Sequence, residues 1–177
     1  MSTVVADMVR DARISDCGLY RYTLDRKWGG SNNYYPMVFI MLNPSTADAS
    51  IDDPTIRRCI GFAQRERQTA IMVVNLFAFR ATSPKDMRAA ADPVGPSNDE
   101  YLDQIFMQCS LRGHHVVAAW GAHGSHLNRA RAVSALARKN ALALQCLGVT
   151  KDGHPKHPLY LPNDAALVPW LSMTEKA

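Results

Sequence analysis

Four apolar runs, each with the length of a buried strand, most limit what this chain can fold into. They are residues 37–42, 71–76, 115–120 and 141–147. Segments of helical character separate them, and apolar runs that alternate with amphipathic helices predict a parallel sheet covered on both faces. We therefore expect an α/β fold, specifically a three-layer α/β/α sandwich with a central, mostly parallel four-stranded sheet.

Capping signals and periodicity indicate the elements around these strands. Helices are expected over residues 53–67, 97–111 and 164–171, and from directly after Gly124 to about residue 139. The first begins at Asp53-Pro54, an N-cap followed by proline at the first helical position. The second begins at Ser97-x-x-Glu100, a capping box. Residues 18–28 alternate in the manner of a strand and should add an antiparallel edge to the sheet.

Length and composition fit one globular domain over residues 1–177, with 47% hydrophobic and 20% charged residues. No apolar run approaches the roughly 20 residues that span a bilayer, and the N-terminus lacks a signal-peptide pattern. We expect a cytoplasmic protein with no membrane partner. The four cysteines form no C-x-x-C pair and should be reduced thiols. The net charge of +4 fits a solvated basic surface as well as a nucleic-acid footprint.

Ligands of open α/β sheets bind at the carboxyl ends of the strands. Four segments occupy such positions, residues 43–45, 75–82, 120–124 and 150–162. One pocket could collect all four, because each follows a buried strand.

The first of these segments contains Asn43, followed by Pro44. The amide oxygen of an asparagine can hold a water molecule but accepts a proton poorly. It suits N-glycosidic cleavage, whose oxocarbenium-like transition state needs only a positioned weak nucleophile. The alternative is a structural Asx-Pro turn. Asp48 and Asp52 are candidates for activating water or supporting the cation, whereas Asp53 is expected to cap a helix.

The second and third segments offer groups that can bind a base and its backbone. Asn75 presents a donor and an acceptor, which suits the Watson–Crick edge of a base. Phe77 and Phe79 could stack on a base or belong to the core, and Arg80 could contact a phosphate. Glycines after the third strand allow close approach to phosphate or sugar.

The fourth segment is rich in histidine and proline. His157 could donate a hydrogen bond to an oxygen of a departing base. Residues 159–161 form an apolar tip that could wedge into a base stack. His154 and His157 have a zinc-like spacing, but prolines flank them and no third ligand is near, so no metal is expected.

In this order the segments resemble the uracil-DNA glycosylase superfamily, particularly its mismatch-specific branch. Asn43-Pro44-Ser45 resembles the "NPG" motif, and Asn75-Leu76 with Arg80-Ala81-Thr82 resembles "TN" and "R-x-T". Residues 116–121 resemble the "LLWG" strand, and residues 157–161 resemble the terminal "HPSPL" loop. The chain resembles more closely the domain-of-unknown-function family 1643 of bacteria and phages, over nearly its whole length. The segments that carry this resemblance include MLNPSTAD, DDPTIRRC, NLFAFRAT and HPLYLP. That family brings no established activity.

The superfamily resemblance implies the three-layer fold and hydrolysis of the bond between a flipped base and its sugar, without metal or cofactor. Asn43 would hold the attacking water, His157 would face the base oxygen, and Leu161 would be the wedge. Base or substrate contacts are expected from Leu42, Pro44, Ser45, Asn75, Phe77 and Phe79. DNA or phosphate contacts are expected from Arg80, Thr82, Gly121, His123, Gly124, Lys151, Lys156, Tyr160 and Leu161. The partner would be DNA, and the protein a monomer.

The chain also departs from the superfamily pattern. Ser45 replaces the glycine of "NPG", and Leu159-Tyr160 replaces the "SP" of the last loop. The expected substrate is therefore an unusual, modified or damaged base in DNA. Two other hypotheses remain open, a non-catalytic nucleic-acid-binding module with a vestigial pocket and a hydrolase of free modified nucleosides or nucleotides.

Overall fold

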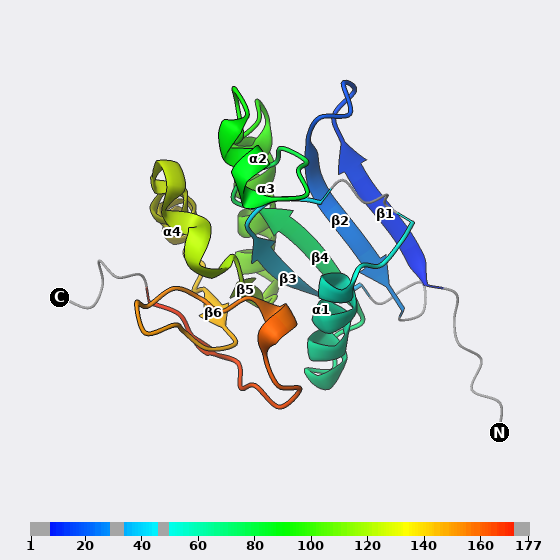
Figure 1. Cartoon of the computed structure of the whole chain (residues 1–177). Coiled ribbons are helices and arrows are strands. Elements are labelled where there is room, and N and C mark those ends of the chain that lie inside the picture. The colour runs from blue at the N-terminus through cyan, green and yellow to red at the C-terminus, as the bar shows by residue number, and fades with distance from the viewer. Residues whose placement is uncertain (1–7, 29–33, 46–49, 172–177) are drawn as a thin grey trace.

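The computed structural model describes residues 8–28, 34–45 and 50–171. The described chain forms a mixed α/β fold with a seven-stranded sheet and four α-helices (Figure 1). The strands are β1 (Val9–Ile14), β2 (Arg21–Lys27), β3 (Pro36–Met41), β4 (Ala70–Asn75), β5 (Val116–Ala118), β6 (Gln145–Cys146) and β7 (Val168–Pro169). The helices are α1 (Pro54–Arg65), α2 (Pro84–Ala89), α3 (Asn98–Arg112) and α4 (Arg129–Lys139), with 3₁₀ segments η1 (Gly121–Asn128) and η2 (Pro158–Tyr160).

The strand order is β1-β2-β4-β3-β5-β6-β7. Neighbours from β4 to β6 pair in parallel, whereas β2 joins β4, β1 joins β2, and β7 joins β6 in antiparallel fashion. The α/β class expected from the sequence is confirmed. The sheet is larger than the expected four strands and one edge, because β1 and β7 extend it. Both are largely exposed and carry no apolar run that would have indicated them.

Two apolar cores lie on opposite faces of the sheet. The α1-side core contains Ile56, Cys59 and Phe62 of α1 packed on Phe39 and Val73 of the sheet. The α3-side core packs α3 and α4 on the alternate strand residues Val38, Ile40 and Val74, and on Leu76 directly after β4. Figure 1 shows α1 separated from α3 and α4 by the sheet. Alternation along buried strands thus serves helices on both faces.

Three local expectations are corrected. Ser97 precedes α3, but its side chain makes no capping hydrogen bond. The helix expected directly after Gly124 begins only at Arg129, because a kinked 3₁₀ stretch with positive φ at Leu127 and Asn128 comes first. Residues 164–171 form no helix. Instead, β7 pairs with β6, and the backbone nitrogen of Trp170 donates to Leu144 O at 2.9 Å.

Asp53 is the N-cap of α1, as expected, and accepts a hydrogen bond from the backbone nitrogen of Ile56. All four cysteines lie in the described residues and none is disulfide-bonded. Cys59, Cys109 and Cys146 are buried and Cys17 is exposed. No helix of the described part is long and apolar enough to cross a membrane.

Candidate functional site

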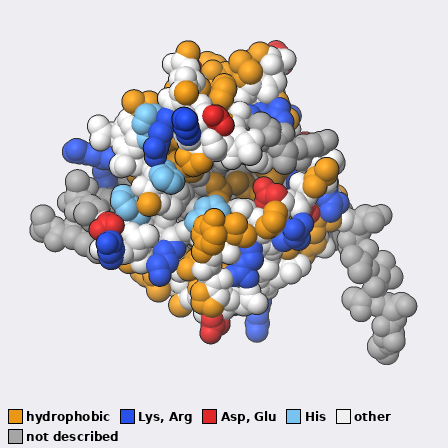
Figure 2. Space-filling view, viewed as in Figure 1, with side chains coloured by type: hydrophobic (Ala, Val, Ile, Leu, Met, Phe, Trp, Pro, Cys, Tyr) orange, Lys and Arg blue, Asp and Glu red, His pale blue; other side chains and the backbone are white. Residues whose placement is uncertain are grey.

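A cavity of about 690 Å³ opens at the carboxyl ends of the parallel strands. Figure 2 shows this face hollowed near its centre, with histidine side chains beside the hollow. All four segments singled out in the sequence contribute to the wall. The expected site residues that line it are Leu42, Asn43, Ser45, Asn75, Thr82, Gly121, His123, Lys156, His157, Tyr160 and Leu161. The volume lies in the range of pockets that hold small molecules and nucleotides.

Asn43 follows β3 and is fixed by its own amide group. Its Nδ2 donates to the carbonyl oxygens of Pro44 at 3.1 Å and Ala81 at 2.9 Å. Two carbonyl partners require the nitrogen on that side, so the orientation of the amide is determined. No described residue donates to its Oδ1. Asn43 therefore presents an oriented acceptor on the cavity wall.

Asn75 lies at the end of the neighbouring strand β4, two residues along from Val73 on the same face. It is 1% exposed, and its Nδ2 has no hydrogen-bond partner. Its backbone oxygen accepts from Asn98 Nδ2 at 3.1 Å. A buried amide donor without a partner costs free energy. A ligand acceptor in the cavity would remove that cost.

His157 reaches the cavity from the loop that leads into η2. Its Nδ1 accepts a hydrogen bond from the backbone nitrogen of Leu159 at 3.2 Å. Burial lowers its pKa below the ordinary 6.5, with Asp53 opposing the shift. The lowered pKa favours the neutral ring at pH 7. Because Nδ1 is the acceptor, Nε2 carries the proton and is the donor that the ring offers.

Asp53 lines the same cavity, and among the described residues of the wall it supplies the carboxylate. Its Oδ1 caps α1 by accepting from Ile56 N at 2.8 Å. Its charge acts on both His157 and Arg21. From the sequence, Asp53 was expected only to cap a helix. The Asp-Pro signal is fully accounted for by a cap, and it does not show that the cap stands at a cavity.

Arg21 is the second residue that sequence reasoning missed. It lies at the start of β2, is 6% exposed and lines the cavity. Its Nε has no hydrogen-bond partner, and within the described ranges its guanidinium forms no ion pair. A bulge in β2 brings it to the cavity, and a pattern of alternation does not reveal a bulge.

The cavity belongs to a segment that matches a known family. A family model described as "Protein of unknown function (DUF1643)" matches residues 21–159, from the start of β2 to η2. The chain belongs to the DUF1643 family. The span covers the whole cavity wall except Tyr160 and Leu161. This confirms the resemblance to domain-of-unknown-function family 1643. No curated protein and no solved structure was found to match the chain.

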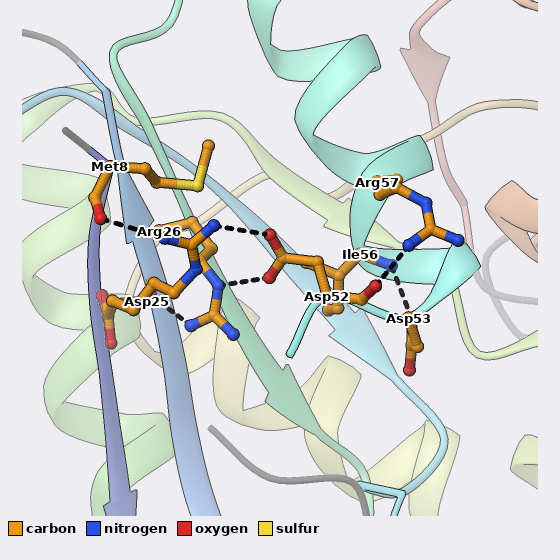
Figure 3. Close-up of polar contacts among 8 residues, drawn as sticks. Met8, Asp25, Arg26, Asp52, Asp53, Ile56 and Arg57 are labelled. Atoms are coloured by element: carbon orange, nitrogen blue, oxygen red, sulfur yellow. Dashed lines mark hydrogen bonds and ion pairs between the residues drawn. The ribbon is translucent and has the colours of Figure 1, made fainter. Parts of the chain in front are cut away.

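Of the two acids expected to act in the chemistry of this DUF1643 protein, Asp52 is described and does not line the cavity. Asp48 lies outside the described residues. Asp52 faces away from Asp53 and binds two arginines, Arg26 Nε at 2.6 Å and Arg10 Nη2 at 3.4 Å (Figure 3). The side chain of Arg26 is fully buried. The structure thus gives Asp52 an ion pair that holds the start of α1 to β2.

Several other expected contacts also lie away from the cavity wall. Phe77 is fully buried in the α3-side core, and Phe79 packs edge-on against Tyr20. Gly124 is buried, and a Cβ there would meet Trp120 at 2.4 Å, so the glycine permits close packing. Pro44, Arg80 and Lys151 are likewise not part of the wall. Arg80 donates to Gly18 O at 2.9 Å, and Lys151 is exposed.

The loop at the cavity rim is anchored to α1. Arg58 donates to the carbonyl oxygens of Pro158 and Leu161, and Arg65 Nη1 donates to Asn163 O at 2.8 Å. Leu161 packs against the α1-side core, whereas Tyr160 is 83% exposed. Tyr160 is therefore the side chain at this tip that is free to contact a large ligand.

No group of three or more His, Cys, Asp or Glu side chains that could hold a metal ion occurs among the described residues. His123 on the wall has its Nδ1 2.8 Å from Arg88 Nη2. The backbone nitrogen of Gly121 donates to Pro155 O at 3.0 Å, which joins the third and fourth segments.

Proposed function

We propose that this DUF1643 protein hydrolyses an N-glycosidic bond, with a flipped base held in the cavity. In this proposal the fold is the three-layer sandwich of the uracil-DNA glycosylase type. The protein acts in the cytoplasm as a monomer on an unusual base in DNA, without metal or cofactor. The observation that carries the proposal is that Asn43, Asn75 and His157, from three distant segments, line one nucleotide-sized cavity.

Asn43 supports the role of water holder. Its Nδ2 is occupied by two carbonyls, and its Oδ1 remains to accept a hydrogen bond from a water molecule. Such fixed positioning lowers the barrier without proton transfer to the amide. The carboxylate of Asp53 stands on the same wall and would stabilise the positive charge that develops on the sugar.

His157 supports the departure of the base. When the carbon–nitrogen bond breaks, its electron pair goes to the base, and negative charge develops on a carbonyl oxygen of the base. A neutral imidazole with its proton on Nε2 can donate to that oxygen. Water adds to the sugar carbon, and its proton leaves to solvent or to the departing base.

The rim supports a nucleic-acid substrate. Tyr160 is exposed at the cavity edge, and Lys156 is exposed on the wall beside it. An aromatic side chain can occupy the gap that a flipped base leaves, and a lysine can bind phosphate. Tyr160 takes the wedge role in this proposal, because Leu161 is packed against the core.

The test is incubation with duplexes that each carry one modified or damaged base, followed by mass spectrometry of released base and by alkali cleavage. We expect release from at least one member and none from Asn43→Ala. Absence of release across the panel would reject the proposal. Salt-dependent DNA binding unchanged by Asn43→Ala would then favour the non-catalytic binding module. Release from free nucleotides alone would favour the free-nucleotide hydrolase.

A further inference from the structure

We infer that the cavity has a subsite for an oxyanion, a carboxylate or phosphate of the ligand, formed by the guanidinium of Arg21 with the amide of Asn75. The inference rests on the proposed function in taking a nucleotide as the ligand, whereas the argument for the charge stands by itself. The inferred substrate is one that carries a negatively charged group, and this group would lie against the wall formed by β2 and β4.

A β-bulge turns Arg21 toward the cavity. In the pairing of β1 with β2, Arg13 is opposite Thr23 and Ile14 is opposite Arg21, which leaves Tyr22 as the extra residue. Bulges re-aim side chains and are frequent beside functional sites.

The bulge breaks the alternation of β2. Leu24 belongs to the α1-side core, and unbroken alternation would put Tyr22 on that face. Instead, the Tyr22 ring stacks on Tyr101 of α3 at 4.6 Å. Arg21 takes the α1 face, where it lines the cavity with Asp53 and Ile56. The bulge in β2 therefore places Arg21 in the cavity wall.

Within the described residues Arg21 forms no ion pair, and its Nε has no hydrogen-bond partner. Burial is the main cause that lowers its pKa to about 10, and the nearby cation Arg80 adds to the effect. At neutral pH the guanidinium remains charged. Asp53 acts in the opposite direction, but the two side chains form no ion pair. A buried cation without a partner is costly, and an anionic ligand is the group that would remove the cost.

Asn75 adds a directional donor on the adjacent strand. Its Nδ2 is buried and unpartnered, and it stands in the same wall as Arg21. The guanidinium offers parallel donors that match the two oxygens of a carboxylate or phosphate. The combination favours a ligand rich in acceptors at this wall. The oxyanion has two possible sources, the phosphate of a nucleotide and a carboxylate carried by a modified base.

Calorimetric titration with three probes tests the subsite and separates the sources. The probes are 2′-deoxyuridine, which is neutral, its 5′-monophosphate, and 5-carboxy-2′-deoxyuridine. We expect at least one charged probe to bind roughly tenfold or more tightly than the neutral one. Preference for the monophosphate identifies the phosphate, and preference for the carboxy compound identifies the base substituent. Either result supports the subsite.

Arg21→Gln should abolish the preference for the charged probe, whereas Arg131→Gln, the same charge change at an exposed position of α4, should retain it. Arg21→Lys keeps the charge and should retain a preference, which guards against a folding defect in Arg21→Gln. Equal binding of all three probes, binding of none, or an unchanged preference in Arg21→Gln overturns the inference. Charge preference without base release would reject the proposed hydrolysis alone, and release without charge preference would reject the subsite alone.

Discussion

The amide nitrogen of Asn43 donates to the carbonyl oxygen of Ala81 at 2.9 Å, a contact between the segments that follow β3 and β4. The backbone nitrogen of Ala81 in turn donates to Pro44 O at 3.0 Å. These two bonds continue the pairing of β3 with β4 beyond the strand ends. Asn43 therefore holds backbone groups together through its amide nitrogen, and it also lines the cavity.

Asn43→Ala should lose both stability and activity. Removal of two hydrogen bonds should lower the free energy of unfolding by about 1–2 kcal/mol. Loss of the oriented oxygen should lower the rate of base release by roughly 100-fold or more. Denaturant unfolding and single-turnover release measure the two effects.

Asn140→Ala is the matched control for that experiment. Asn140 Nδ2 also makes two hydrogen bonds, to Asp103 Oδ1 at 2.7 Å and Leu136 O at 3.0 Å, but lies away from the cavity wall. It should lose similar stability and keep its release rate. Equal rates in the two variants would show that Asn43 acts only through the fold.

Two substitutions of Asp53 separate the effect of its helix-capping hydrogen bond from the effect of its negative charge. Asp53→Ala removes both and should cost about 1 kcal/mol of stability. Asp53→Asn keeps a good cap and should be nearly as stable as the parent. Both variants should slow base release, roughly 100-fold if the carboxylate supports the reacting centre. Thermal unfolding and release assays on the pair decide the matter, since full activity in Asp53→Asn would leave Asp53 a cap alone.

Much of this site could be predicted from the sequence. Apolar runs indicate buried strands, and the carboxyl ends of parallel strands meet at one edge, so Asn43, Asn75 and His157 were expected together and line one cavity. The exposed strand β1 could not be predicted in this way, because strands are recognised by burial and β1 has little.

The remaining residues depend on geometry that the sequence does not encode locally. Asp52 and Asp53 are adjacent acids whose side chains diverge at the start of α1 (Figure 3). Asp52 binds Arg26, whereas Asp53 caps α1 and lines the cavity. Arg21 depends on the unmatched Tyr22 of the bulge. A difference of one residue in register reverses the face of a side chain, and sequence periodicity does not resolve it.

Asp52→Ala should destabilise the protein strongly. It removes the carboxylate that Arg26 Nε binds at 2.6 Å, and the Arg26 side chain is fully buried. Loss of one member of such a pair costs about 3 kcal/mol. Urea unfolding should show this loss, while the release rate measured below the unfolding transition should be unchanged. A stable but inactive Asp52→Ala would contradict the structural role and return Asp52 to the chemistry.

Stability should depend on pH through His157. Burial lowers its pKa below 6.5 in the folded chain, so the unfolded chain binds a proton first as the pH falls. The free energy of unfolding should therefore fall between pH 6.5 and the lower folded pKa. Protonation of Nδ1 would also break the bond from Leu159 N. In His157→Gln this part of the fall in the free energy of unfolding should disappear. Urea unfolding of both proteins at pH 7.5 and 5.5 measures the difference. His114, whose pKa is lowered by burial too, remains in both proteins and cancels.

Tyr160→Ala distinguishes a DNA substrate from a free nucleotide. The side chain is 83% exposed, so its removal should change stability by less than about 0.5 kcal/mol. If Tyr160 fills the gap left by a flipped base, release from duplex DNA should fall roughly tenfold, since the cost of unstacking the base is then no longer offset. Hydrolysis of the corresponding free nucleotide should be unchanged, because no stack has to open. An equal loss on both substrates would place Tyr160 in direct contact with the base, and no loss on duplex DNA would remove the wedge from the mechanism.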